Sequence, residues 1–442
     1  MADSQAQSPS LKEVFRTFGK IGLINFGGPA GQIALMHKVL VDEKHWIDED
    51  GFLRALNFCT LLPGPEAQQL ATYVGWRLRG VRGGLAAGLL FIGPGAVVVL
   101  SLSVLYVFAA RLGPVAAAFL GVKAAVLAIV VEALLRLARR ALNTPLKRVV
   151  AGAAFLALFA LHAPFPAVIV IAGLVGLAAA HLRPESLKLG APLSGAPASP
   201  VRSLFGPAAL TAVSWCAVWA APLALVFVVL GPEHILFQIG LFFAKLALVT
   251  FGGAYAVLAY MAQEVVVGHG WLKAGEMVDG LGLAETTPGP LILVTEFVGF
   301  LAAFRAPAPF APLAAGLIGA ALTLWMTFAP CFLWIFTGAP FIERLEHARR
   351  LQGALATITA AVVGVIGNLA LWFALHVLFG RFVEARLGVV DVSVPAVASL
   401  QWPALALSAV AALLLFRLHL GVLKTLAASV GLGLALHLAG IG

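Results

Sequence analysis

The stretch FGGPAGQIALMHK, residues 26–38, has a partner in FGGAYAVLAYMAQ, residues 251–263, so that the same Phe-Gly-Gly triplet stands twice in one apolar chain. A Pro-Gly-Pro triplet follows each copy, at 63–65 and at 288–290. Both pairs are offset by the same distance (251 − 26 = 288 − 63 = 225). Glycine in a helix interior costs about 1 kcal/mol relative to alanine, and proline about 3 kcal/mol. Residues this costly, repeated at one spacing, indicate a duplicated chain.

Comparison of the two copies extends the duplication beyond the triplets. With the offset of 225, residues 18–65 match 243–290 at 14 of 48 positions, without gaps. Among these matches are Lys20 with Lys245 and Trp46 with Trp271. Further along, LAAG at 85 recurs at 313. We therefore predict two homologous repeats.

The composition places the chain in a membrane. Of its 442 residues, 61% are hydrophobic and 11% are charged, with a mean hydropathy of +0.99, whereas a soluble domain is about one quarter charged. Thirteen apolar stretches are close to the roughly 20 residues that a helix needs to cross a bilayer. The sequence thus predicts an all-α polytopic membrane protein with about 10–13 transmembrane segments, several of them broken or re-entrant.

Several other classes of protein are disfavoured. The net charge of +9 is the excess of Lys and Arg expected in cytoplasmic loops, so no nucleic-acid partner is predicted. The three cysteines are scattered, and no HExxH or GxxxxGK[ST] motif is present. We expect no metal, no cofactor and no ATP-driven step, and an intramembrane enzyme would need converging catalytic groups that the spans lack.

Basic residues in short loops set the orientation. The segment RLARRALNTPLKR, 136–148, is predicted to be cytoplasmic, and counting spans outward from it also places the N-terminus inside. The predicted organisation is a first repeat at 1–182, a cytoplasmic linker at 183–205, a topology-inverting transmembrane helix at 206–230 and a second repeat at 231–442. Six spans plus this extra helix make an odd number, so the repeats should be inverted copies. Inverted repeats are the common architecture of secondary transporters.

The glycines and prolines fall near the middle of their stretches and predict interrupted helices at membrane depth. A broken backbone is tolerated there only where it is buried in protein or lines a cavity. A half-helix that starts at Pro65 would present free N–H groups and a partial positive charge, which suit an oxyanion. Kinks that serve only packing are the alternative explanation.

Polar residues near these breaks complete the candidate site. Ionisable residues at such depth are functional candidates by default. Glu66 and Glu285 are candidates for coupling, whether as proton carriers, counter-charges or helix caps, and the sequence does not choose between these roles. Arg54 and the equivalent Asp279 either face the bundle or mark a membrane surface. The candidate substrate-binding residues are Lys20, Asn25, Phe26, Gly27, Gly28, Pro29, Pro63, Gly64, Pro65, Glu66, Gln68, Gln69, Lys123, Lys245, Thr250, Phe251, Gly252, Gly253, Thr287, Pro288, Gly289 and Pro290.

With its two sets of FGG, Trp and PGP motifs, the sequence resembles the chromate ion transporter family over nearly its whole length. The resemblance implies efflux of chromate, with sulfate as a similar anion, across the bacterial inner membrane. The second copy departs from the first, because Ala254 replaces Pro29 and Leu291 replaces Glu66. The two half-sites are therefore expected to differ, with the first making more of the substrate contact. A passive anion channel and a transporter of another anion stay open, as does a homodimer.

Overall fold

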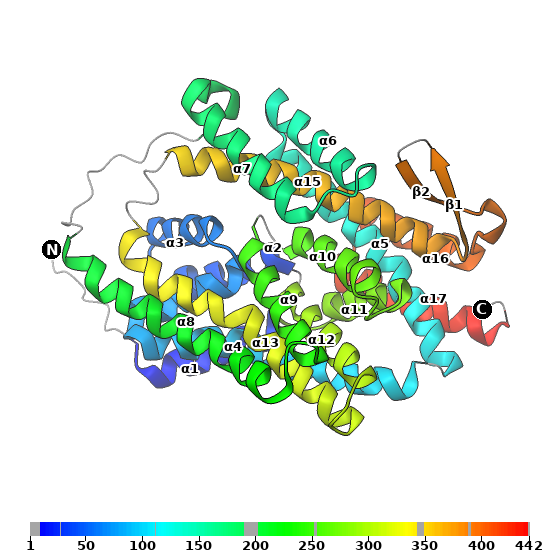
Figure 1. Ribbon diagram of the computed structural model, residues 1–442, viewed down its shortest axis with the longest axis horizontal. Coiled ribbons are helices and arrows are strands. Elements are labelled where there is room, and N and C mark those ends of the chain that lie inside the picture. The colour runs from blue at the N-terminus through cyan, green and yellow to red at the C-terminus, as the bar shows by residue number, and fades with distance from the viewer. Residues whose placement is uncertain are drawn as a thin grey trace. The chain divides into compact units, whose positions relative to one another are not determined.

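The computed structural model describes residues 9–26, 28–110, 112–189, 202–251, 254–342, 349–387 and 390–440. Most of these residues are helical (Figure 1). Within them, six helices are long and apolar enough to cross a membrane, and four apolar helices are shorter. The long helices are Glu66–Ala109, Gly113–Ala141, Phe165–Leu182, Gly206–Leu230, Pro312–Phe341 and Arg349–Leu378.

The first repeat begins with α1, which Ser10 caps by accepting a hydrogen bond from the Glu13 amide. α4 contains a non-helical turn at Arg79 and Gly80, which divides it into two helical parts. The helices of this repeat are α1 (Leu11–Ile24), α2 (Gly28–His37), α3 (Glu49–Leu61), α4 (Glu66–Ala109), α5 (Gly113–Ala141), α6 (Pro145–Phe159) and α7 (Phe165–Leu182).

The second repeat reproduces this order after α8 (Arg202–Leu230). Its α11 begins and ends 225 residues after α3 (274 − 49 = 286 − 61 = 225). A short π-helical turn follows α2 at Lys38–Glu43 and its counterpart α10 at Glu264–Gly268. The helices are α9 (Ile235–Val249), α10 (Ala254–Gln263), α11 (Ala274–Thr286), α12 (Val294–Arg305), α13 (Pro312–Gly338), α15 (Arg349–Leu378), α16 (Trp402–Ala412) and α17 (Val422–Leu438).

All four predicted interruptions are present. α1 ends at Ile24 and α2 starts at Gly28, while α9 ends at Val249 and α10 starts at Ala254. α3 ends at Leu61 before the first PGP, and α11 ends at Thr286 before the second. Several apolar stretches are therefore pairs of short helices. One detail differs from the prediction: α4 starts at Glu66, one residue beyond Pro65. Gly27, Gly252 and Gly253 lie outside the described residues.

A β-hairpin adds to the helical architecture. β1 (Phe382–Leu387) pairs antiparallel with β2 (Val390–Pro395), with Phe382 opposite Pro395. The sequence VDVSVP in β2 alternates apolar and polar residues, which is the strand period. The all-α prediction holds for the membrane-spanning helices and missed this connection between α15 and α16.

The predicted linker, 183–205, is described at both of its ends. A 3₁₀ turn covers Pro184–Leu187, and α8 starts at Arg202, inside the predicted linker. Residues 190–201 lie outside the described part of the chain. The connection between α7 and α8 is therefore shorter than the predicted linker.

The chain folds into two compact units, each built from segments of both repeats. In unit 1, α12 and α8 pack on α13; in unit 2, α6 and α7 lie along α15, and α17 lies along α5 (Figure 1). Unit 1 comprises Met1–Ser101, Ala191–Ala254 and Thr287–Ala348, and unit 2 comprises Leu102–Gly190, Tyr255–Thr286 and Arg349–Gly442.

Candidate functional site

The breaks of the two repeats are joined to each other inside unit 1. The Gly64 amide donates to the Thr250 carbonyl at 2.8 Å, and the Gly289 amide donates to the Asn25 carbonyl at 3.1 Å. The offset of 225 relates Asn25 to Thr250 and Gly64 to Gly289. Each PGP glycine therefore bonds to the residue that precedes the FGG motif of the other repeat. Such an exchange of equivalent contacts is typical of a two-fold relationship. We call the pair the crossed contacts.

The first crossed contact is reinforced by side chains. Asn25 Oδ1 accepts from the Gly289 amide at 2.6 Å, and Asn25 Nδ2 donates to the Phe91 carbonyl at 3.3 Å. Gln32 Nε2 donates to the Gly289 carbonyl at 2.6 Å. Asn25 and Gln32 are fully buried, so these hydrogen bonds replace those that water cannot supply.

The second crossed contact uses the backbone alone. The Thr250 hydroxyl donates to the Leu246 carbonyl of its own helix at 2.7 Å. The Thr250 carbonyl, and not its side chain, accepts the hydrogen bond from Gly64. Gly64 has a φ of +126°, and a Cβ there would lie 2.7 Å from Gln69 Nε2 and 3.0 Å from Cys331 Sγ. Glycine is therefore required at this position by both conformation and space.

The start of α4 lies next to this second contact. Ala67, Gln68 and Gln69 are buried and Glu66 is half-buried. Gln69 Nε2 donates to the Pro63 carbonyl at 2.7 Å, and Gln68 Nε2 donates to Thr72 Oγ1 at 3.1 Å. The first amides of a helix have no backbone acceptor within that helix, so this end of α4 carries a partial positive charge. The Glu66 carboxylate accepts a hydrogen bond from its own amide.

The other predicted site residues of unit 1 take up different positions. Lys20 and Lys245 are exposed on α1 and α9, outside the buried hydrogen-bond network. Phe26 and Phe251 form matching turns, each donating its amide to the carbonyl two residues earlier. Thr287 is buried. Of the other members, Gly28 and Pro29 begin α2, and Pro288 and Pro290 lie in the break that follows α11.

Glu285 belongs to unit 2 and is buried. Tyr255 donates its hydroxyl to Glu285 Oε1 at 2.7 Å. On α5, Arg136 donates a hydrogen bond to Glu132. Both residues interact electrostatically with Tyr255, and Glu132 also interacts with Glu285. Of the two coupling candidates, Glu66 lies at a PGP break in unit 1 and Glu285 is held by a tyrosine in unit 2.

Lys123 also belongs to unit 2, where it forms an ion pair with Asp279. The Nζ–Oδ1 distance is 3.1 Å, and the Tyr106 hydroxyl donates to the other carboxylate oxygen at 2.8 Å. Asp279 therefore faces the interior of its unit, whereas the equivalent Arg54 is exposed.

Sequence reasoning overlooked several buried polar residues. Glu296 in the first turn of α12 is 1% exposed, and its Oε2 has no hydrogen-bond partner among the described residues. Its place inside LILVTEFVGF is the same kind of signal that singled out Glu66. Gln32 stands in a similar apolar run. For Tyr106 and Tyr255 no local pattern exists, because their partners are far away in the sequence.

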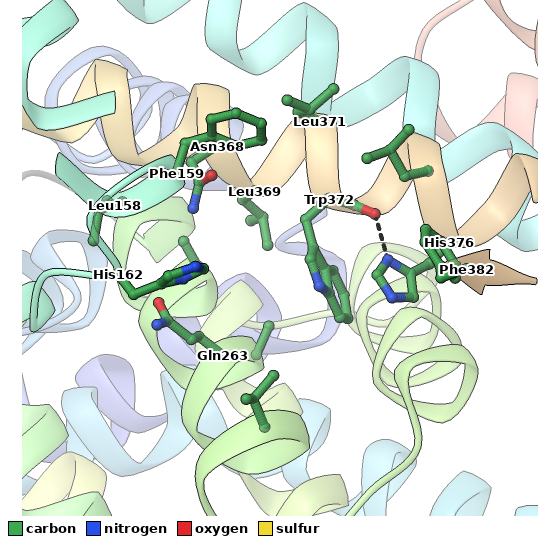
Figure 2. Close-up of a pocket in the computed structure, with 14 residues that line it drawn as sticks. Leu158, Phe159, His162, Gln263, Asn368, Leu369, Leu371, Trp372, His376 and Phe382 are labelled. Atoms are coloured by element: carbon green, nitrogen blue, oxygen red, sulfur yellow. Dashed lines mark hydrogen bonds between the residues drawn. The ribbon is translucent and has the colours of Figure 1, made fainter. Parts of the chain in front are cut away.

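A cavity of about 400 Å³ opens in unit 2 between α6, α10, α15 and β1. Figure 2 shows its largely apolar wall, with the amides of Gln263 and Asn368 and the ring of Trp372. His376 stacks between Trp372 and Phe382 and hydrogen bonds the Trp372 carbonyl at 2.9 Å. No Lys or Arg contributes to the described wall, so the cavity offers no cation to an anion. No cluster of metal-ligating side chains lies among the described residues either.

Comparison with known proteins gives the family. The model of the chromate transporter family matches residues 12–177 and 237–434, one region in each repeat. A chromate transport protein of Pseudomonas aeruginosa is 34% identical over 83% of this chain and 82% of its own length. A chromate transport protein of Cupriavidus metallidurans is 27% identical over 82% of each chain. An uncharacterized transporter of Methanocaldococcus jannaschii is 26% identical over 84% of this chain and 86% of its own.

The chain belongs to the chromate transporter family. The resemblance noted in the sequence is confirmed, and so are the two repeats. The chain is a multi-pass helical membrane protein of a transporter family, not an enzyme. No solved structure matches the chain at a significant level.

Proposed function

We propose that this chain is a secondary active transporter that exports chromate across the bacterial inner membrane. Two of its relatives are chromate transport proteins, and sulfate is an anion of similar shape and charge. The main support for a substrate site is the pair of crossed contacts, which join the broken helices of both repeats in unit 1. Broken helices at the interface of two repeats are the usual substrate site of such transporters.

The geometry favours the start of α4 as the main anion-binding element. The amides of Gly64 and Gly289 already donate to carbonyls in the crossed contacts, so they have no hydrogen left for a ligand. The amides of Ala67 and Gln68 stand in the first turn of α4, where helix geometry supplies no backbone acceptor. They would hold an oxyanion next to the half-buried Glu66. Lys20 and Lys245 would add charge along its path.

We further propose that the repeats are inverted and that they exchange conformations in an alternating-access cycle. The proposed organisation keeps the N-terminus and the segment 183–205 cytoplasmic, with 206–230 as the helix that inverts the second repeat. An odd number of spans before that repeat supports this arrangement, together with the two-fold character of the crossed contacts. Inverted repeats of this kind interconvert inward-open and outward-open states.

An ion gradient or anion exchange would drive export. Glu66 and Glu285 are the proposed coupling groups, because a carboxylate at membrane depth costs several kcal/mol unless it is paired or protonated. The test is chromate and sulfate flux with purified protein in liposomes, under imposed pH and potential gradients. Uphill accumulation is expected, and flux that only ever runs downhill would favour a passive channel.

The coupling groups are tested with Glu66→Gln and Glu285→Gln in the same liposomes, measured across pH. Loss of the pH dependence in either variant supports a role in proton coupling. If both variants keep the wild-type pH dependence, neither glutamate carries the proton.

A further inference from the structure

A buried charged centre lies in unit 2. It consists of Lys123 on α5, Asp279 on α11 and Tyr106 on α4. Lys123 stands 10 residues after the first residue of α5, Gly113 (123 − 113 = 10), which is about 15 Å along a helix. The hydrocarbon core is about 30 Å thick, so a span that enters it at Gly113 carries Lys123 near its middle.

The two charged partners differ in accessibility. The Lys123 side chain is 26% exposed and the Asp279 side chain 7%. Gly275 lies beside the ammonium group, since a Cβ built on Gly275 would be 3.5 Å from Lys123 Nζ. Lys123 Nζ thus packs against Gly275, and a side chain larger than one methyl group at 275 would cover it. A ligand can approach the cation through the exposed quarter of the Lys123 side chain, while the carboxylate of Asp279 stays shielded.

Charge balance determines when that cation is available. While Asp279 is ionised, the pair is neutral and its attraction for an anion is small. A proton on Asp279 removes the competing carboxylate and leaves the full charge of Lys123 at low dielectric, where an anion gains most from it. Tyr106 can still hydrogen bond the protonated carboxyl. We propose that Lys123 binds the small oxyanion and that Asp279 takes up a proton as it does so.

Asp279 is the carboxylate of this centre that can take up the proton. The charged and hydrogen-bonding groups that interact with it are Lys123 on α5, Tyr106 on α4 and Glu276 on its own helix. α15 and α17, which also pack on α11, carry their described ionisable residues near their ends. These are Arg349, Arg350 and His376 on α15, and Lys424 and His437 on α17.

The inference rests on the proposed function, since it assumes a transported oxyanion. It also predicts that the proton crosses the membrane in the same direction as the anion. One proton carried with a dianion leaves one net negative charge per cycle, and a membrane potential that is negative inside drives this charge outward. A pH gradient directed inward would oppose the same cycle.

The test is isothermal titration of the purified full-length chain with sodium chromate and, separately, sodium sulfate. Titrations in two buffers of different ionisation enthalpy give the number of protons taken up per anion. We expect Asp279→Asn to take up about one proton fewer per anion than the wild-type chain, as linkage requires. Asp279→Glu keeps a carboxyl and is expected to keep the wild-type number. Binding without proton uptake by the wild type, or the same uptake in Asp279→Asn as in the wild type, would overturn the proposal.

A second pair of variants locates the anion without changing any charge. Gly275→Leu fills the space beside Lys123 Nζ and is expected to weaken anion binding about tenfold or more. Gly152→Leu is the matched control, because no atom lies within 4 Å of a Cβ at Gly152. Equal affinity of both variants and the wild type would exclude an anion at Lys123. A wild-type chain that neither binds nor transports either anion would instead refute the proposed function.

Discussion

The two crossed contacts of unit 1 share a backbone hydrogen bond and differ in their side chains. At the first, Asn25 and Gln32 add three hydrogen bonds to Gly289 and Phe91. At the second, Thr250 contributes its carbonyl, and the position equivalent to Gln32 is Val257. Both contacts have the same backbone hydrogen bond, but their side chains differ in chemistry. Duplication has thus kept the scaffold two-fold while the polar groups have become unequal.

The largest expected effect comes from adding one methyl group at the second contact. Gly64→Ala must accommodate a Cβ 2.7 Å from Gln69 Nε2 at a φ of +126°. Strain and overpacking together should lower the free energy of unfolding in detergent by about 3–5 kcal/mol. Gly289→Ala meets a similar φ of +103° and Leu293 Cδ1 at 2.6 Å. Leu293 Cδ1 makes no hydrogen bond and can turn away, whereas Gln69 Nε2 is held by the Pro63 carbonyl, so the loss should be smaller. Thermal unfolding of both variants, with Gly93→Ala as control, measures the difference. Equal losses would mean that the two PGP turns are equally constrained.

Next in size is the loss of the asparagine. Asn25→Ala removes hydrogen bonds to Gly289 and Phe91 and should cost about 2–3 kcal/mol of unfolding free energy. Thr250→Ala keeps the carbonyl that binds Gly64 and should cost less than about 1 kcal/mol. The two variants are compared by denaturant unfolding in the same detergent. A Thr250→Ala loss as large as that of Asn25→Ala would contradict the asymmetry described above.

A smaller effect is expected when the first contact is made to resemble the second. Gln32→Val installs the residue of the second repeat and removes the hydrogen bond to the Gly289 carbonyl. The expected cost is about 1–2 kcal/mol, with transport retained because the backbone contact stays. Unfolding and chromate flux are measured on the same preparation. Loss of transport at unchanged stability would place Gln32 in the transport step itself.

The smallest effect on stability belongs to the repeat-related lysines. Lys20→Gln and Lys245→Gln change exposed side chains and should shift the unfolding free energy by no more than about 0.5 kcal/mol. Any change in chromate flux then reports on the anion path alone. If Lys20→Gln slows transport more than Lys245→Gln, the first half-site dominates, as Glu66 and Leu291 already suggest. The opposite order would reverse that assignment.

The breaks could be predicted from the sequence because glycine and proline act locally on the backbone. Their positions near Phe26, Pro63, Phe251 and Pro288 followed from residue type and spacing alone, and the structure places helix ends at all four. The repeat was equally visible, since two whole triplets and a tryptophan recur at one spacing of 225 residues.

The partners of the polar residues could not be predicted in this way. Tyr106 and Asp279 are 173 residues apart and Asn25 and Gly289 are 264 apart, and no local periodicity encodes such contacts. The sequence placed Lys123 with the motif residues, whereas the structure pairs it with Asp279 in the other unit. The hairpin was overlooked for a different reason: the alternation in VDVSVP is short and lies between two apolar helices, the long α15 and the shorter α16.

The crossed contacts also bear on how the chain is made. Gly64 leaves the ribosome 186 residues ahead of Thr250, the residue whose carbonyl accepts its amide (250 − 64 = 186). Until the second repeat is inserted, that amide must find water or another acceptor, because an unpaired amide is costly inside a bilayer. The break in the first repeat therefore reaches its final hydrogen bonding only when the second repeat is in place, so the two repeats complete their folding together.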